Sequence, residues 1–325
     1  MTEKRDNRML EEKKKLVSIV IPAYNEEDVI EELGRGLQAL MERNARYDFE
    51  VIIVENGSQD RSYDKIVALH QQDSRFKIVQ LSRNFTADGG VAAGLRYCNG
   101  DCAVLMDADL QDPPEIVDSF LEKWEQGHDV VYGIIVSREG ISPLRKLLNR
   151  IFYYLLNKAS QGTIPANVTA FRLIDRIVYS QLNQMPESHR FTRGLCSWTG
   201  FSQVGIEFKR SKRFAGESKA PFWDALKEAL DALFSFSYLP LRFITFLGLA
   251  LSAFCFAFLL FQIIVAIVMV EDVPGFRTVV FTILMMFGFL FISLGVIGEY
   301  IARIFDEVKG RPLFIVKNTM GFSKD

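Results

Sequence analysis

Two aspartates separated by one residue, Asp107 and Asp109, follow a short apolar segment in the sequence MDADLQDPPE. In an extended chain, residues i and i+2 point to the same side, so both carboxylates can face one ion. Carboxylate oxygens suit Mg²⁺ or Mn²⁺, which also bind nucleotide phosphates, and Gln111 can add an amide oxygen. A solvated acidic turn is the alternative for so short a motif. The preceding strand and the stiff Pro113–Pro114 pair favour the metal site.

Polar segments also follow three other apolar runs. They are PAYNEE (Pro22 to Glu27), ENGSQD (Glu55 to Asp60) and SRNF (Ser82 to Phe85). A carboxylate such as Glu55 can accept a hydrogen bond from a base or a ribose hydroxyl, although the same segment could be a turn chosen for its Asn-Gly pair. Each of the four polar segments directly follows an apolar run. This shared position predicts that their acids and amides lie together along one edge of the fold.

These segments need a scaffold that brings them together, and the apolar runs supply it. Short apolar, β-branched runs predict buried parallel strands at Leu16 to Ile21, Phe49 to Val54, Lys77 to Leu81 and Asp101 to Met106. Helices are expected after Asn25, which can cap the first one, and at Tyr63 to Gln72 and Gly89 to Tyr97. The alternation predicts an α/β fold with a mostly parallel, doubly wound sheet, and ligands bind beyond the carboxyl ends of such strands.

Composition excludes some classes of protein. The chain has 325 residues and a formal net charge of −2, so its overall charge does not indicate a nucleic-acid partner. Its four cysteines form no CxxC pair, which argues against structural disulfides and against a cysteine zinc site. Residues 1–15 are charged, lack an apolar core and are expected to form a solvated arm rather than a secretory signal.

Two apolar stretches near the C-terminus are long enough to cross a hydrocarbon core of about 30 Å. Leu241 to Val270 contains Arg242 as its one charge, and Val279 to Gly298 contains none. Buried helices of a soluble protein are the alternative. Basic residues are enriched before the first stretch and after the second, which predicts that the N-terminal domain and both termini are cytoplasmic.

Basic and amphipathic segments flank the predicted spans. FKRSKRFAGESK carries Lys209, Arg210, Lys212, Arg213 and Lys219 and could contact phosphates or anionic headgroups. Ser142 to Ser160 has the spacing of an interfacial helix or of an ordinary core helix, and Pro221 to Ser237 is similar. The planar guanidinium of Arg172 suits a phosphate.

Taken together, PAYNEE, the Glu-Asn-Gly-Ser segment, LSRNF, MDADLQDPPE and GEYIARIFDEVKGRP resemble glycosyltransferase family 2. The match is closest to its polyprenyl-phosphate sugar transferases, the group of bactoprenol glucosyltransferase and dolichol-phosphate mannose synthase. The resemblance implies a Rossmann-like GT-A fold, a divalent cation, inversion at the anomeric carbon, and transfer from a nucleotide sugar to a polyprenyl phosphate. It also implies a homo-oligomer, since the family includes tetramers, in the bacterial inner membrane.

Roles carried over from the resemblance fall on matching positions of this chain. The nucleotide would be bound by Pro22, Tyr24, Asn25, Glu26, Glu55, Asn56, Ser58 and Asp107. Metal binding would fall to Asp107 and Asp109, catalysis to these two with Gln111 and Arg172, and phosphate binding to Arg172, Arg213 and Lys219. The implied organisation is an arm (1–15), a catalytic domain (16–220), a juxtamembrane amphipathic helix (221–238), a transmembrane pair (239–304) and a cytoplasmic tail (305–325).

The sequence departs from the family pattern at three positions. Many relatives have a second acid at Asn56, an Asp at Ala170 and a Gly at Thr86. The missing Asp does not exclude catalysis, because a phosphate monoester is mainly a dianion near neutral pH and needs no general base.

We therefore expect an inverting transfer of one hexose from UDP-glucose to undecaprenyl or another polyprenyl phosphate, for use in the cell envelope. The alternatives are GDP-mannose or a UDP-N-acetylhexosamine as donor, or a non-catalytic membrane scaffold. A processive synthase is disfavoured, because two spans are too few for a channel and a QxxRW motif is absent.

Overall fold

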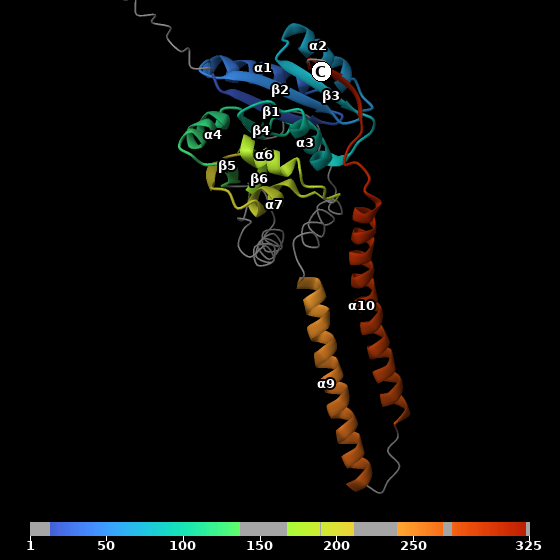
Figure 1. Cartoon of the computed structure of the whole chain (residues 1–325). Coiled ribbons are helices and arrows are strands. Elements are labelled where there is room, and N and C mark those ends of the chain that lie inside the picture. Colours follow the sequence, from blue (N-terminus) through green and yellow to red (C-terminus); the bar gives the residue numbers. More distant parts are fainter. Residues whose placement is uncertain (1–13, 137–167, 189, 211–238, 269–274, 323–325) are drawn as a thin grey trace, which may run out of the picture.

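The computed structural model describes residues 14–136, 168–188, 190–210, 239–268 and 275–322. An α/β domain carries a pair of long helices that extend away from it side by side (Figure 1). The predicted arm, the segment Ser142 to Ser160 and the juxtamembrane helix at 221–238 lie outside the described residues, apart from Lys14 and Lys15 of the arm.

Four parallel strands form the centre of the sheet, in the order β4-β1-β2-β3. Their bounds are Leu16–Ala23 (β1), Asp48–Glu55 (β2), Phe76–Leu81 (β3) and Cys102–Leu105 (β4). Successive residues Val51, Ile52, Ile53 and Val54 are all fully buried, alternating between the two faces. Helices cover both faces of such a sheet, which is why these strands appear as continuous apolar runs in the sequence.

The remaining strands extend the sheet at both sides to the order β7-β5-β6-β4-β1-β2-β3-β8. Their bounds are Val130–Ile135 (β5), Val168–Asp175 (β6), Gln203–Phe208 (β7) and Val316–Met320 (β8). β6 runs antiparallel to both β4 and β5, while β7 runs parallel to β5. The sheet is therefore mixed around a parallel centre, which agrees with the mostly parallel α/β fold predicted from the sequence.

Helices pack on both faces of the sheet. One face is covered by α1 (Ile30–Arg43), α2 (Ser62–Gln72) and α4 (Ile116–Glu125), and the other by α3 (Thr86–Arg96), α6 (Arg176–Leu182) and α7 (Thr192–Trp198). α3 approaches the sheet very closely, because a Cβ added at Gly94 would lie 2.3 Å from Cγ1 of Val20. This close packing places the N-terminal end of α3 against the loops that follow β1 and β2.

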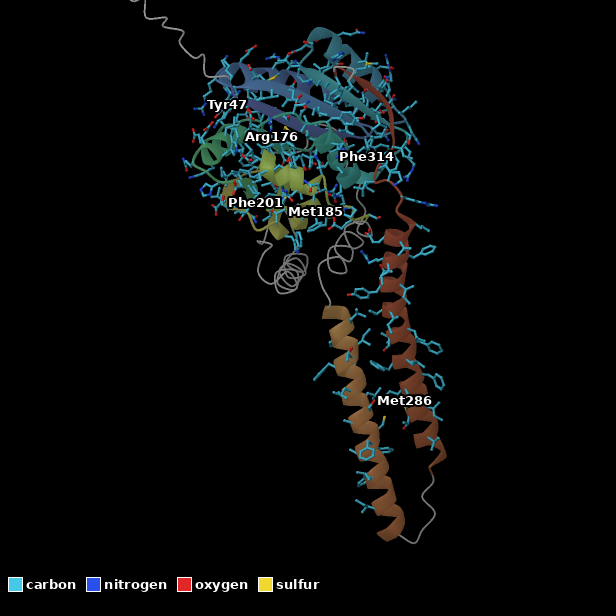
Figure 2. All side chains as sticks on the ribbon, viewed as in Figure 1. Tyr47, Arg176, Met185, Phe201, Met286 and Phe314 are labelled. Carbon is cyan, nitrogen blue, oxygen red and sulfur yellow. The ribbon has the colours of Figure 1, made fainter. Side chains whose placement is uncertain are left out.

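The two long helices are α9 (Leu239–Val268) and α10 (Phe276–Lys309). Within the described residues, Met285–Lys309 is long and apolar enough to cross a membrane, and nearly all of its described side chains are at least partly exposed. α9 contributes a shorter apolar stretch, Phe243–Phe258, so a second span stays a prediction. Met286 of α10 lies in the gap between the two long helices in this view, with its residue surface half-exposed (Figure 2).

The segment 305–325, expected to be a cytoplasmic tail, is in part a piece of the domain. α10 continues to Lys309, and Gly310 ends it in the left-handed conformation with φ 58°. The chain then pairs antiparallel with β3 as β8, and Phe314 packs with the apolar residues between α3 and the sheet (Figure 2). A single short strand that pairs only with a distant part of the chain leaves little local signal in the sequence.

Candidate active site

The loops that follow β1 and β2 are joined by hydrogen bonds at the carboxyl edge of the sheet. The backbone N–H of Asn25 donates to Oγ of Ser58 at 3.1 Å, and the N–H of Glu26 donates to Oγ of Ser62 at 2.7 Å. Glu55 is buried and accepts a hydrogen bond from the backbone N–H of Ser58. The structure thus brings together the predicted nucleotide-binding residues of these two loops: Pro22, Tyr24, Asn25, Glu26, Glu55, Asn56 and Ser58.

Asn25 is not a helix cap, contrary to the sequence prediction. The first helix begins five residues later at Ile30, and its N-cap position is Val29. Asn25 itself adopts a left-handed conformation with φ 53°, which Asn tolerates better than most residues. Its Oδ1 accepts a hydrogen bond from the N–H of Gln59 at 2.8 Å, so it braces one loop against the next.

Asn56 has a structural role that suits an amide at a position where the family resemblance implied an acid. Its Oδ1 accepts from the N–H of Phe85 at 2.9 Å, and its Nδ2 donates to the carbonyl oxygen of Thr86 at 2.7 Å. A carboxylate could accept the first bond but could not donate the second. Thr86, the position of a frequent glycine, adopts φ 67°, so Asn56 holds a strained turn at the start of α3.

Asp107 and Asp109 lie in a tight turn, not in the extended chain that the sequence predicted. β4 ends at Leu105, and Leu110 adopts φ 57°. The turn is closed by the backbone N–H of Gln111, which donates to Oδ1 of Asp109 at 3.1 Å. Both aspartates still follow the end of β4, at the same sheet edge as the nucleotide loops.

A third carboxylate and an arginine complete this cluster. Arg210, two residues beyond β7, donates from Nε to Oδ1 of Asp112 at 3.1 Å and from a terminal nitrogen to Oδ2 of Asp107 at 3.2 Å. Burial raises the pKa of Asp107, and the charge of Asp109 adds to the rise. Burial also raises the pKa of Asp112 to about 6, against the opposing effect of Arg210. Both pKa shifts reflect the removal of water from carboxylates that lie close together.

The described residues contain no group of three or more His, Cys, Asp or Glu side chains that could together hold a metal ion. The carboxylate cluster nevertheless fits a cation. Asp112 is fully buried, and its Oδ2 has no hydrogen-bond partner. Asp107, Asp109 and Asp112 lie close enough to influence one another, with Arg210 bound to two of them, and their oxygens are ligands that suit a divalent ion.

A small cavity of about 90 Å³ adjoins Asp107 and is lined by Ala170, Arg172, Thr192 and Arg193, among others. Ala170, on β6, lines the cavity at the position where the family resemblance implied an Asp. The Arg172 guanidinium is 2% exposed and donates to the backbone carbonyls of Thr169, Ala170 and Arg193. Arg172 thus lines the cavity, but backbone acceptors already hold its guanidinium.

Arg193 is a residue that the sequence analysis missed. It lies in the first turn of α7 and lines the same cavity, and its positive charge, like that of Arg210, opposes the rise that burial causes in the pKa of Asp107. Its guanidinium also lies 4.8 Å from the ring centroid of Phe191. The surrounding sequence ESHRFTRGL contains several polar residues, and nothing in their spacing singles out this one. Arg213 and Lys219, the other predicted phosphate ligands, lie outside the described residues.

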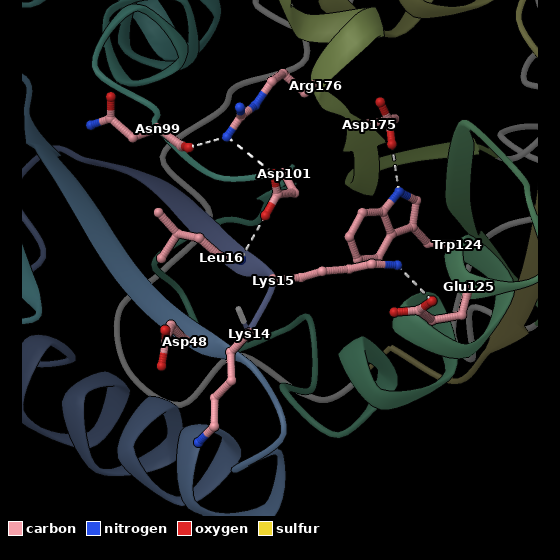
Figure 3. Close-up of a pocket in the computed structure, with 10 residues that line it drawn as sticks. All are labelled: Lys14, Lys15, Leu16, Asp48, Asn99, Asp101, Trp124, Glu125, Asp175 and Arg176. Carbon is pink, nitrogen blue, oxygen red and sulfur yellow. Dashed lines mark hydrogen bonds and ion pairs between the residues drawn. The ribbon is translucent and has the colours of Figure 1, made fainter. Parts of the chain in front are cut away.

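A larger cavity of about 750 Å³ opens at the opposite, amino edge of the sheet (Figure 3). Its charged side chains pair with one another: Lys15 with Glu125 at 2.7 Å and Arg176 with Asp101 at 3.2 Å. Ligands of parallel sheets bind at the carboxyl edge, where the acidic cluster and the nucleotide loops meet. The smaller cavity is therefore the better candidate for chemistry.

The sequence from residue 18, in β1, to residue 182, the last residue of α6, matches Glycosyl transferase family 2. The chain belongs to this family. It is accordingly a glycosyltransferase, and the resemblance to bactoprenol glucosyltransferases is confirmed by relatives that match nearly the whole chain.

Three relatives illustrate this family membership. An uncharacterised glycosyltransferase of Synechocystis is 40% identical over 94% of this chain and 96% of its own length. An uncharacterised glycosyltransferase of Bacillus subtilis is 38% identical over 94% of each chain. The prophage-derived bactoprenol glucosyl transferase of Shigella flexneri is 35% identical over 93% of this chain and 98% of its own length.

Similar solved structures are more distant in sequence. Glucosyl-3-phosphoglycerate synthase from Mycobacterium tuberculosis, in complex with Mn²⁺, UDP-glucose and phosphoglyceric acid, is 18% identical with a TM-score of 0.46. The match covers 68% of this chain and 78% of that one.

Proposed function

We propose that this glycosyltransferase moves one glucose from UDP-glucose to a polyprenyl phosphate at the cytoplasmic face of a bacterial inner membrane. The observation that carries the proposal is the cluster of Asp107, Asp109 and Asp112, in which a buried oxygen of Asp112 has no hydrogen-bond partner, at the sheet edge where the nucleotide loops converge. The lipid acceptor and glucose are proposed because a relative that matches 93% of the chain is a bactoprenol glucosyl transferase.

Asp107 and Asp109 would hold Mg²⁺ or Mn²⁺ together with oxygens of the donor diphosphate. When bound, the ion would supply charge neutralisation for the leaving nucleotide. Two protein carboxylates suffice for such a site, because Mg²⁺ is commonly bound through one or two carboxylates and substrate phosphates. Glu55, Asn25 and their loop partners would surround the nucleoside.

The acceptor phosphate would enter the cavity beside Asp107. Arg193 provides a positive charge there, while Arg172 holds the cavity wall through its three backbone acceptors. A phosphate dianion needs no proton removed before it attacks, so Ala170 leaves the chemistry intact. These side chains would reduce the repulsion between two anionic substrates and align them for in-line transfer.

The helix pair would bring the site to the lipid. We propose that α9 and α10 both cross the bilayer, with the catalytic domain and both termini in the cytoplasm. Beyond α10, the carbonyl of Ile315 accepts from the N–H of Ser82 at 2.9 Å, directly after β3. Glu307, near the end of α10, accepts from the N–H of Ser188 at 2.8 Å, just before α7. These contacts connect α10 with the carboxyl edge of the sheet, where the substrates would meet.

A transfer assay tests the proposal. Full-length protein in detergent is incubated with polyprenyl phosphate, Mg²⁺ and radiolabelled UDP-glucose, GDP-mannose or UDP-N-acetylglucosamine. We expect label in the lipid phase from UDP-glucose, and a fall of about a hundredfold or more for Asp109→Asn. Asp118→Asn is the matched control and should keep full activity, because this side chain contacts Arg43 and Asn44 at the end of α1 and not the acidic cluster. Transfer from one of the other donors alone would replace glucose as the assigned sugar. Nucleotide binding without transfer from any donor would indicate a non-catalytic scaffold.

A further inference from the structure

The end of α10 that meets the α/β domain is attached to the chain just before α7. Glu307, three residues before the glycine that ends this helix, accepts at Oε1 a hydrogen bond from the backbone N–H of Ser188 at 2.8 Å. Because the Glu307 side chain is exposed, this bond contributes little to the stability of the fold. Its effect is on position, since it joins a long helix to a loop 119 residues away in the sequence.

The residues that follow Ser188 lead directly into the candidate cavity. The backbone N–H of Thr192 donates to Oδ1 of Asp88 at 3.1 Å. Asp88, in the first turn of α3, lines the cavity beside Asp107, and so does Arg193, the residue after Thr192. A short stretch of chain therefore carries the contact with α10 at one end and part of the cavity wall at the other.

Arg190 fixes the middle of this stretch. Its guanidinium donates to the carbonyl oxygen of Leu182, the last residue of α6. Burial lowers the pKa of Arg190, and the carboxylates of Glu187 and Asp88 lie close enough to oppose that change. Arg190 is thus held between α6 and α3, so a displacement at Ser188 is passed along the chain rather than absorbed in it.

The chain beyond α10 approaches the same part of α3. The carbonyl oxygen of Leu313 lies 3.7 Å from the position of a Cβ added at Gly89, the residue next to Asp88. In Figure 1, α10 reaches the domain on the side of α3. The end of α10 therefore contacts the surroundings of the cavity twice, before α7 and beside α3, and a change in its orientation should move the cavity wall.

We propose that Glu307 is a positioning residue for sugar transfer, which couples the orientation of α10 through Ser188 to the place of Arg193 in the cavity. This inference rests on the proposed function, since it assumes that the acceptor phosphate binds beside Arg193 and that α10 crosses the bilayer holding the lipid. The coupling would align the cavity with the depth of the lipid phosphate. A misplacement of about 1 Å can lower a rate about a hundredfold, so even a weak bond can matter for transfer.

Three substitutions of Glu307 in the full-length protein separate its hydrogen bond from its charge. Glu307→Ala removes both, Glu307→Asp keeps the charge on a side chain too short for the bond, and Glu307→Gln keeps an acceptor oxygen without the charge. For Ala and Asp we expect kcat/KM for polyprenyl phosphate to fall about fivefold to tenfold, whereas Gln should stay within about twofold of the wild type. UDP affinity, from calorimetry at saturating Mn²⁺, and the melting temperature should not change in any of them.

Asp306→Ala is the matched control, because this carboxylate pairs with Lys309 of the same helix at 3.8 Å. It should transfer sugar at the wild-type rate. Asp88→Ala provides a second test, since it removes the acceptor of the Thr192 N–H at the other end of the stretch. If the two ends act through one unit, the double variant Asp88→Ala, Glu307→Ala should lose less activity than the product of the two single losses.

Wild-type transfer by both Glu307→Ala and Glu307→Asp would overturn the positioning role, and so would single losses that multiply fully in the double variant. An equal loss of UDP affinity or a lowered melting temperature would show a general structural role in its place. A wild-type protein that transfers no sugar to polyprenyl phosphate would instead refute the proposed function itself.

Discussion

The close approach of α3 to the sheet makes a sharp prediction about glycine. A Cβ added at Gly94 would lie 2.3 Å from Cγ1 of Val20 and 3.1 Å from Cγ2 of Val54. Carbon atoms in contact normally lie about 3.5–4.0 Å apart, so the first distance is too short by more than about 1 Å. Both valines are fully buried and β-branched, and neither can turn aside easily. Gly94→Ala must therefore push α3 away from β1.

The same substitution should have the opposite effect in α1. A Cβ at Gly36 would meet only Cγ of Pro114, at an ordinary distance of 3.6 Å. Gly36→Ala should stabilise the protein by about 1 kcal/mol through helix propensity. Gly94→Ala can gain at most the same stabilisation from helix propensity. It should also lose about 1–3 kcal/mol of stability, because the added methyl group overpacks the contact between α3 and β1. The free energies of unfolding of the two variants should thus differ by about 1–3 kcal/mol.

Gly34 provides an intermediate case within α1. A Cβ there would lie 2.7 Å from Cδ1 of Leu69, the far end of a flexible side chain that can move. The expected order of stability is Gly36→Ala, then Gly34→Ala, then Gly94→Ala.

Thermal unfolding of the full chain in detergent, followed by tryptophan fluorescence, measures this order. Each kcal/mol corresponds to about 2–4 °C for a domain of this size. If Gly94→Ala melts at or above the temperature of Gly36→Ala, the packing of α3 on β1 is wrong, and with it the position of the loops that α3 supports.

Three further predictions follow from other contacts. Gly90→Ala would place a Cβ 2.8 Å from Cβ of Pro22, so it should weaken nucleotide binding in calorimetry by more than it lowers the melting temperature. Glu50→Gln should destabilise the protein by about 3 kcal/mol, because it removes the charge that pairs with Lys77 at 2.6 Å in a largely buried site; urea unfolding measures this, and a loss below about 0.5 kcal/mol would contradict it. Deleting residues 311–325 removes β8 and should lower both the melting temperature and lipid-linked transfer, whereas unchanged transfer would show that β8 does not help to position the site.

The four parallel strands at the centre of the sheet were predictable, because a strand that is buried on both faces appears in the sequence as a continuous run of apolar residues. The four predicted strands match β1 to β4 within a few residues, and each is a run of apolar residues. β8 was not predictable in this way, because its pairing with β3 joins residues more than 200 positions apart. A single five-residue strand with one lysine and two other polar residues does not indicate which partner strand it will pair with.

The candidate site was predictable in its location and less so in its details. The rule that ligands bind beyond parallel strand ends brought the loops of β1, β2 and β4 to one edge. The turn at Asp107 and the bracing role of Asn25 depend on local backbone conformation, which residue types alone did not fix. Arg193 and Arg210 reach the cluster from α7 and from the end of β7, and only the packing of the whole domain places them there.

The most direct test of the account is the location of the ion in a crystal of the full chain grown with Mn²⁺ and UDP. Anomalous scattering of Mn²⁺ locates the ion independently of the surrounding protein density. The account predicts a single strong peak between Asp109, Asp107 and the diphosphate, with the nucleoside against the loop of Glu55. A peak elsewhere, or a nucleotide bound in the cavity at the amino edge of the sheet, would contradict it.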